Sequence, residues 1–117
     1  MRLNITGINL SMSEALRDHI ELRIRSAVGR CAHYVRKVCV SCTDINGPRG
    51  GHDKQFKIYA TLVPCGDLVI IDTDRDLYSA VTRSTTRLKL QVRRFANYRA
   101  KNRRQSRYRR IAAPARD

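Results

Sequence analysis

The sequence predicts an α+β protein in which a four-stranded sheet carries two helices packed on one face, in the order β-α-β-β-β-α. Two segments repeat their apolar residues every three or four positions, as amphipathic helices do. Four shorter segments are rich in apolar and β-branched residues and are bounded by turn residues, as strands are. A chain of 117 residues has room for one compact domain. The simplest way to bury these faces is to pack both helices on the same side of the sheet.

The first strand and the first helix follow directly from the residue pattern near the N-terminus. Apolar and polar residues alternate from Arg2 to Ile8, which predicts a strand. Ser11 and Glu14 have the spacing of a capping box, so the helix is expected to begin there. Its apolar stripe consists of Met12, Leu16, Ile20, Ile24 and Val28. The helix is expected to end between residues 29 and 34.

Three further strands are predicted over Lys37 to Ile45, Lys54 to Val63 and Leu68 to Thr73. Turn residues separate them, at 46–51 and 64–67, so the three strands are expected to form an antiparallel meander. The middle strand alternates cleanly between apolar and polar residues. Its polar face consists of Gln55, Lys57, Tyr59 and Thr61. We expect this face to lie opposite the helices, open to solvent.

The second helix is predicted to begin after Asp74 or Asp76, either of which can cap it. Its apolar stripe consists of Tyr78, Val81, Thr85, Leu88, Val92 and Phe95. Because Tyr78 belongs to this stripe, we expect it to pack in the core. The stripe ends at Ala100, beyond which a frayed basic segment is expected. The chain is therefore predicted to consist of an α+β domain over residues 1–98 and a flexible basic tail over residues 99–117.

Positive charge is the dominant feature of the sequence, and it is unevenly placed. The chain has 24 basic and 10 acidic residues, for a net charge of +14. Residues 1–76 contain 11 basic and 9 acidic residues, whereas residues 77–117 contain 13 basic residues and 1 acidic residue. A nearly neutral body followed by a strongly basic segment predicts a polyanionic partner. Most of the basic residues are arginines, whose planar guanidinium groups match phosphate oxygens.

Metal sites are not favoured by the residues that might form them. Cys39 and Cys42 lie three positions apart in a predicted strand and therefore point to opposite faces. Structural thiols in a reducing compartment are the better interpretation. Asp72, Asp74 and Asp76 alternate and share one strand face, which is an arrangement that can hold magnesium. The favoured interpretation is that they end the strand and cap the helix, so neither a metal nor a cofactor is predicted.

Enzymes and membrane proteins are also disfavoured. The glycines of residues 47–51 lack the Lys-Ser or Lys-Thr ending of a phosphate-binding loop, and no Ser/His/Asp arrangement supports a catalytic triad. We therefore expect no enzymatic activity. No apolar run approaches the roughly 20 residues that cross a bilayer, and residues 1–15 do not resemble a signal peptide. A cytoplasmic protein without a membrane partner is expected.

The order of elements and several short phrases resemble the ribosome hibernation-promoting factors and ribosome-associated inhibitors, also called ribosomal subunit interface proteins. The phrases are Leu3–Gly7, Glu14–Arg17 and Asp76–Val81, and the resemblance to the short form of this family spans roughly residues 1–94. It implies a fold like the double-stranded RNA-binding domain with an extra N-terminal strand. It also implies binding to rRNA in the mRNA–tRNA channel of the small ribosomal subunit, where the protein competes with mRNA and tRNA and silences idle ribosomes.

The resemblance places the family's basic residues at Arg17 and Arg23 on the first helix and at Arg87 and Arg94 on the second. Combined with the charge pattern, it predicts that rRNA is bound by Arg17, Arg23, Arg25, Lys54, Lys57, Arg83, Arg87, Lys89, Arg93, Arg94, Arg99 and Lys101. Tyr98 and Tyr108 alternate with arginines and are expected to stack on exposed bases. For Tyr98, packing against the rest of the protein is an equally supported alternative.

Several questions stay open at the level of sequence. The chain is expected to be a monomer off the ribosome and to lack the C-terminal dimerisation domain of the long form, so its effect on ribosome pairing is undecided. The heavily basic segment 99–110 also fits a general RNA or DNA chaperone that coats nucleic acids through its basic helix and tail. A third function, protein binding through the polar sheet face, has no positive support in the sequence.

Overall fold

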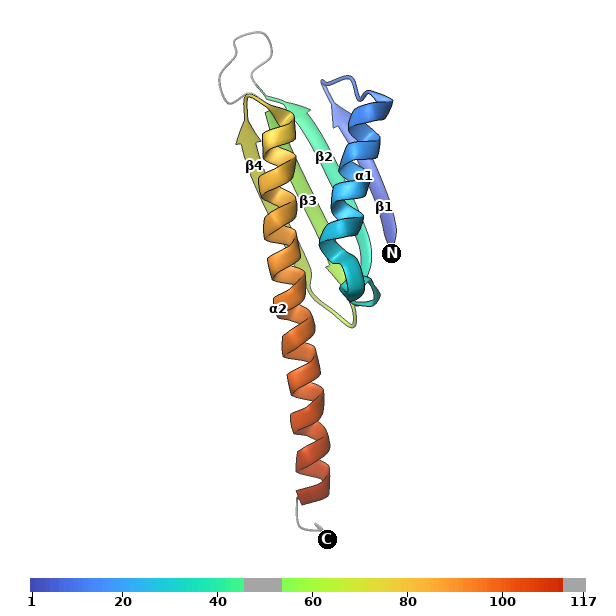
Figure 1. The fold of residues 1–117 in the computed structure, drawn as a ribbon, viewed down its shortest axis with the longest axis vertical. Helices are drawn as coiled ribbons and strands as arrows, with labels where there is room; N and C mark the ends of the chain where they lie inside the picture. Colours follow the sequence, from blue (N-terminus) through green and yellow to red (C-terminus); the bar gives the residue numbers. More distant parts are fainter. Residues whose placement is uncertain (46–53, 113–117) are drawn as a thin grey trace.

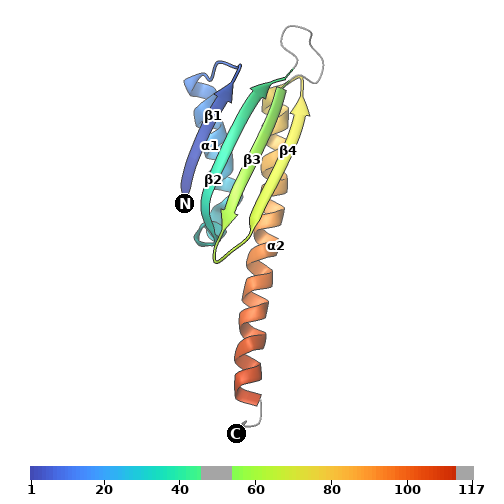
Figure 2. The same cartoon turned by 180° about the vertical axis from the view of Figure 1, so that it is seen from behind.

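The computed structural model describes residues 1–45 and 54–112, with side chains described as far as Lys101. The elements are β1 (Arg2–Ile8), α1 (Glu14–Val28), the 3₁₀ helix η1 (Gly29–Tyr34), β2 (Val35–Asp44), β3 (Lys54–Leu62), β4 (Asp67–Asp74) and α2 (Leu77–Ala112). The strands form one sheet in the order β1-β2-β3-β4. Both helices cover one face of it (Figure 1), and the other face is left uncovered (Figure 2). The predicted α+β fold is confirmed.

Strand pairing follows from the connections. Strands β1 and β2 are parallel, because α1 crosses over the sheet between them, and β2, β3 and β4 form the predicted antiparallel meander. Between β1 and α1 the chain folds back closely on itself. A Cβ atom at Gly7 would lie 2.6 Å from Cγ of Met12, so only glycine fits there. Met12 itself packs against the core from this connection.

The helix α1 begins later than the sequence predicted. Its cap is Ser13, whose Oγ accepts a hydrogen bond from the backbone N–H of Leu16 at 3.1 Å. The prediction of a capping box formed by Ser11 and Glu14 is therefore wrong, and Met12 precedes the helix. Both serines have the residue type that caps helices, and the local pattern did not distinguish them. The remainder of the predicted stripe of α1 is buried as expected.

The core lies between the helices and the covered face of the sheet. The two helices contribute Leu16, Ile20, Ile24, Val28, Val81, Leu88 and Val92, and the strands contribute Val38, Val40, Cys42, Phe56, Ile58, Ala60, Leu62 and Ile70. Each of the larger side chains stabilises the fold by about 1.5–3 kcal/mol through burial. Residues that alternate with these on the strands are exposed or half-buried, which confirms that the polar face of β3 lies opposite the helices.

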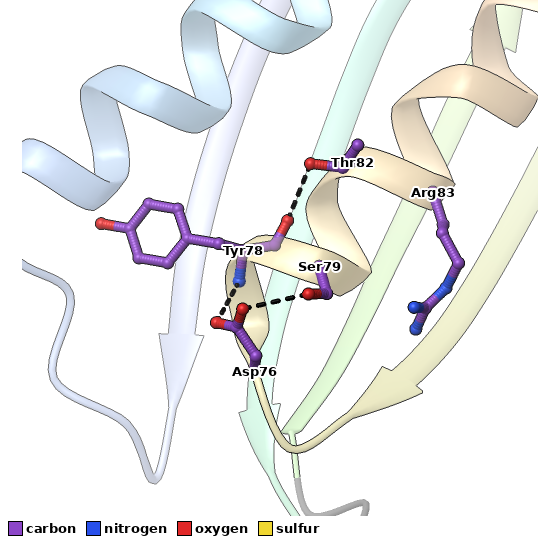
Figure 3. Close-up of a pocket in the computed structure, with 5 residues that line it drawn as sticks. All are labelled: Asp76, Tyr78, Ser79, Thr82 and Arg83. Carbon is purple, nitrogen blue, oxygen red and sulfur yellow. Dashed lines mark hydrogen bonds between the residues drawn. The ribbon is translucent and has the colours of Figure 1, made fainter.

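The start of α2 is fixed by Asp76, one of the two predicted caps. Its carboxylate accepts hydrogen bonds from the backbone N–H of Tyr78 at 3.1 Å and from Oγ of Ser79 at 3.0 Å (Figure 3). Because the helix begins at Leu77, it is Leu77 that is buried against the core. Tyr78 is 46% exposed, and its ring lies 4.9 Å from that of His19 on α1. The prediction that Tyr78 packs in the core is wrong.

The helix α2 is much longer than the sheet it covers. It has 36 residues, which corresponds to about 54 Å, and it gives the molecule extents of 70 × 23 × 19 Å. Among the residues up to Lys101 whose side chains are described, the last buried one is Ala96, after which the helix runs clear of the sheet (Figure 1).

The backbone stays helical to Ala112, whereas the sequence predicted fraying after Ala100. The basic segment favours a helix because Arg, Lys, Gln and Ala have high helix propensity, and the next proline is Pro114. The division of the chain into residues 1–98 and 99–117 stays a prediction. Within the described residues, no helix combines the length and apolar character that crossing a bilayer requires.

Candidate nucleic-acid interface

The arginines in the first turns of α2 are paired with acids at the end of β4. The Nε of Arg83 lies 2.8 Å from Oδ2 of Asp72, and its Nη2 lies 2.7 Å from Oδ2 of Asp74. Arg87 approaches the same Asp72 oxygen at 3.6 Å. The hydrogen bond from Arg83 lowers the pKa of Asp72, and the two carboxylates raise the pKa of Arg83. The charges of Arg83 and Arg87 are therefore largely compensated within the protein.

The ion pairs of Asp72 and Asp74 also bear on the alternative that three acids near the end of β4 hold a magnesium ion. Asp72 and Asp74 face α2 and bind its arginines, while Asp76 caps the helix. Among the described residues, no group of three His, Cys, Asp or Glu side chains is arranged to hold a metal ion. The favoured interpretation of the sequence, in which these acids end the strand and begin the helix, matches the geometry.

The predicted binding residues of α1, and Lys54 at the start of β3, also have intramolecular partners. Nη1 of Arg17 donates to the carbonyl oxygen of Ile5 at 2.9 Å, which ties α1 to β1. Arg25 pairs with Glu21 one turn earlier at 3.0 Å, and Lys54 pairs with Asp44 across the β2–β3 ladder at 3.2 Å. The pair of Arg25 is exposed and is worth only about 0–1 kcal/mol, so Arg25 can exchange its partner for a phosphate.

Arg23 joins the two helices. Its Nε and Nη2 donate to Oγ1 of Thr85 at 3.3 and 3.1 Å, and Nη2 also approaches the carbonyl oxygen of Thr82 at 3.4 Å. The side chain thus spans the space between α1 and α2. Its partners in these contacts are a hydroxyl and a carbonyl oxygen, so none of them neutralises its positive charge. Arg23 both holds the helices together and supplies charge to the surface between them.

The basic residues in the second half of α2 differ from those in the first half in having no internal partner among the described residues. Among the described residues, the predicted cations without a hydrogen bond or ion pair are Lys57, Lys89, Arg93, Arg94, Arg99 and Lys101. All but Lys57 lie on α2 after Leu88, and all but the half-buried Arg99 are exposed. No acid occurs in the sequence between Asp76 and Asp117. This half of the helix is therefore the strongest cationic surface of the described chain.

Two adjoining pockets lie between α1 and η1 on one side and α2 on the other. They share Ser26, Ala27 and Lys89 in their linings, and we refer to them together as the inter-helix groove. Its polar and charged lining consists of Arg23, Ser26, Arg30, Thr85, Thr86, Lys89, Arg93 and Asn97. No carboxylate of a described residue lines it. Four cations with hydroxyl and amide groups between them are suited to bind phosphate oxygens.

Sequence reasoning missed part of this groove. Arg30, Ser26, Thr86 and Asn97 were not predicted to bind RNA, although all four line it. A signal was present for two of them. Arg30 lies seven positions after Arg23, and Asn97 lies four positions after Arg93, so each shares a helix face with a predicted cation.

Other predicted residues lie outside the groove. Lys57 is on the uncovered face of the sheet, and Arg94 projects from α2 without lining the groove. Tyr98 is 65% exposed, which rules out the alternative of core packing and leaves its ring accessible for stacking. The side chain of Tyr108 lies outside the described residues, so its predicted stacking stays a prediction.

The cysteines have the arrangement that the strand pattern predicted. Cys42 faces the core and pairs in the ladder with Phe56, while Cys39 lies on the other face beside Tyr59. Burial raises the pKa of the Cys42 thiol to about 11. This thiol is therefore protonated and unreactive at neutral pH.

Comparison with known proteins identifies the family. A family model described as "Sigma 54 modulation protein / S30EA ribosomal protein" matches residues 3–100. The chain belongs to this family. The ribosome hibernation promotion factor of Bacillus subtilis strain 168 is 29% identical over 96 residues, which are 80% of this chain and 48% of that relative. The chain therefore spans about half the length of the curated relative it matches.

Solved structures of the same family have the same fold. The N-terminal domain of Thermus thermophilus Protein Y superposes with a TM-score of 0.64 at 27% identity, covering 81% of this chain and 99% of that domain. A ribosomal subunit interface protein from Coxiella burnetii superposes with a TM-score of 0.70 at 20% identity, covering 83% and 99%. The family resemblance inferred from the sequence is confirmed. This S30EA family is one of ribosome-associated binding factors and not of enzymes.

Proposed function

We propose that this S30EA family protein binds the rRNA of the small ribosomal subunit in the mRNA–tRNA channel and keeps idle ribosomes from translating. The observation that carries the proposal is the cationic surface formed by the inter-helix groove and the second half of α2, to which the described residues contribute no acid. The name of the Bacillus subtilis relative, a ribosome hibernation promotion factor, supports the ribosome as the partner. The protein would then act in the cytoplasm, as a monomer when it is not bound.

Binding by this surface would rest on phosphate contacts. Lys89, Arg93 and Arg94 would each displace counterions condensed on the RNA, which makes affinity fall with rising salt. Structured RNA is recognised mainly through its shape and backbone, so low sequence specificity is expected. Ser26 and Asn97 add hydrogen-bonding groups for phosphate or ribose oxygens.

Inhibition would come from occlusion. The molecule is long and narrow, with a cross-section of 23 × 19 Å, and α2 extends well beyond the sheet (Figure 1). A rigid body of this shape, held by its helices along the walls of an RNA channel, leaves no room for another chain in the same place. mRNA and tRNA would therefore compete with it, and no chemical step is needed.

The proposal is tested by sedimentation. Purified protein is run with small ribosomal subunits on sucrose gradients at moderately high salt, with and without initiator tRNA and mRNA. We expect the protein to migrate with the subunit and to be displaced when both ligands are added. If the protein still migrates with the subunit in the same amount after tRNA and mRNA are added, binding in the decoding channel is contradicted. With whole ribosomes, a dimer peak or its absence would show whether the protein pairs them.

A general nucleic-acid chaperone is a second candidate, favoured by the basic part of α2 that extends beyond the sheet. This candidate predicts similar affinity for any duplex or single strand, and loss of binding when residues 99–117 are deleted. The ribosome proposal predicts that the deleted protein still binds small subunits, because the inter-helix groove lies entirely within residues 23–97. The deletion therefore separates the two functions in one experiment.

A further inference from the structure

The sheet has a second surface, on the side away from the helices, that the proposed function does not use (Figure 2). Strand register places its residues in cross-strand rows. One row consists of Asn4, Cys39, Tyr59 and Val69, and the next consists of Thr6, Ser41, Lys57 and Ile71. These eight side chains form the centre of what we refer to as the open sheet face.

The centre of the open sheet face is aromatic and apolar. Tyr59 is 39% exposed, and its neighbours on β4, Val69 and Ile71, are 51% and 47% exposed. The carboxylate of Asp67 on the adjacent strand raises the pKa of the Tyr59 phenol, chiefly as a hydrogen-bond acceptor. An exposed aromatic ring beside apolar side chains is a suitable surface for stacking a base.

The charge of the open sheet face favours a polyanion. Its cations are Arg2, Lys37 and Lys57, and Asp67 is its single acid among the described residues. The acids at the end of β4, Asp72 and Asp74, face the other way and bind α2. Protein-binding patches are depleted in lysine at their centres, whereas lysine beside an aromatic ring is typical of surfaces that bind single-stranded nucleic acid.

Apart from Ile8 and Cys39, the remaining side chains on the open sheet face are hydrogen-bonding groups of the kind that contact bases and riboses. They are Asn4, Thr6, Ser41, Thr43, Gln55, Thr61 and Thr73. Along β3, Lys57 and Tyr59 are two residues apart on the same face, and therefore about 7 Å apart. The cation of Lys57 and the ring of Tyr59 are thus close enough to contact a phosphate and a neighbouring base of the same single strand.

We propose that the open sheet face is a second RNA-binding surface, which binds single-stranded RNA by stacking a base on Tyr59 and pairing adjacent phosphates with Lys57 and Lys37. Four-stranded sheets that present aromatic side chains to unpaired bases are a recurrent way of binding RNA. Because the helices lie on the opposite side, the protein can hold a structured RNA in the inter-helix groove and an unpaired strand on the sheet at the same time. The proposal does not require ribosome binding.

The test is an NMR titration of the full-length, ¹⁵N-labelled protein with a single-stranded octaribonucleotide of mixed sequence. Elevated salt weakens the phosphate contacts of α2, and affinity is read from the amides of the open sheet face alone. We expect the amides of Cys39, Ser41, Lys57 and Tyr59 to shift together. Stacking on Tyr59 predicts that Tyr59→Leu weakens this binding by about 5-fold to 100-fold.

Matched variants separate stacking from general charge. Tyr59→Phe keeps the ring and is expected to bind within about threefold of the parent, since stacking needs only the aromatic face. Lys57→Gln is expected to weaken binding and to reduce its salt dependence by about 0.7 in log affinity per tenfold change in salt. Lys89→Gln removes the same charge from the opposite side of the molecule and is expected to leave the shifts on the sheet unchanged.

Three outcomes would overturn the proposal. Shifts confined to α1 and α2 would place the oligonucleotide on the helices only. Equal affinity of the folded Tyr59→Leu and Lys57→Gln variants and the parent would exclude both contacts. If the sheet amides shift with protein concentration in the absence of RNA, the open sheet face is a contact between two copies of the chain and not an RNA-binding surface. None of these outcomes bears on ribosome binding, which is measured separately by sedimentation.

Discussion

The two halves of α2 carry the same kinds of basic residue, but only one half offers them to a partner. In the first half, Arg83 and Arg87 are paired with Asp72 and Asp74 of β4. In the second half, after Leu88, the cations have no hydrogen bond or ion pair within the described residues. The comparison shows that the number of charges on a helix does not identify a binding surface. What lies opposite each charge decides whether it is available.

The difference has a simple structural origin. Strand β4 ends in acids at the point where the chain turns back to begin α2, so the first turns of the helix pass directly beside them. Further along, the described residues of α2 that pack on the sheet are apolar, and of these Leu88 and Val92 are buried completely or nearly so. Beyond Ala96 it runs clear of the sheet. Its charges there have no acidic strand end to meet.

The largest expected effect comes from breaking the apolar contact at the boundary between the two halves. Leu88→Ala removes a fully buried side chain and is expected to lower the free energy of unfolding by about 2–5 kcal/mol. Leu90→Ala, two positions further on an exposed face, is the matched control and is expected to cost less than about 1 kcal/mol. Urea unfolding followed by circular dichroism measures both. Similar losses in the two variants would contradict the assigned packing of α2.

A smaller effect is expected from releasing the paired arginines. Asp72→Asn removes the carboxylate that Arg83 and Arg87 share and should lower the free energy of unfolding by about 1 kcal/mol. The same change should strengthen RNA binding several-fold, because Arg87 loses its carboxylate partner and Arg83 keeps only Asp74. Asp18→Asn, at an exposed acid of α1, removes equal charge without breaking an ion pair. RNA binding that strengthens equally in both variants would show that only net charge matters.

The smallest effect is a dependence of stability on pH. The folded protein has a lowered pKa at Asp72 because Arg83 donates a hydrogen bond to the carboxylate. The stabilisation is therefore complete above the ordinary Asp pKa of about 3.9 and is lost as the pH falls through the lower, folded-state pKa. Stability curves of the parent and Asp72→Asn between pH 7 and pH 2 should converge at the acid end. Parallel curves would exclude the ion pair.

The fold was predictable from the sequence because its helices and strands have clear periodicities. The predictions that were wrong are those that depend on which residue begins a helix. Ser11 and Ser13 are both suitable caps, and only the hydrogen bond from the backbone N–H of Leu16 to Oγ of Ser13 shows which of them is used. Tyr78 has the right spacing for the apolar stripe, but a helix that begins at Leu77 turns it toward His19 instead.

The candidate interface was predictable only in outline, since pairing between distant segments decides which charges are free. Arg83 and Asp72 are eleven positions apart in sequence and belong to different elements, so no local pattern marks Arg83 as occupied. The inter-helix groove likewise joins Arg30 of η1 to Lys89 of α2. The charge asymmetry pointed to α2 but did not separate its paired arginines from its unpaired cations.

The central claim, that the second half of α2 binds the small ribosomal subunit, is tested most directly with two double variants of equal net charge. One is Lys89→Gln and Arg93→Gln, and the other is Arg83→Gln and Arg87→Gln. Binding to small subunits is measured over a range of salt. The first variant should lose affinity and reduce the slope of log affinity against log salt by about 1.4, while the second stays close to the parent. Equal losses, or a larger loss in the second variant, would contradict the account.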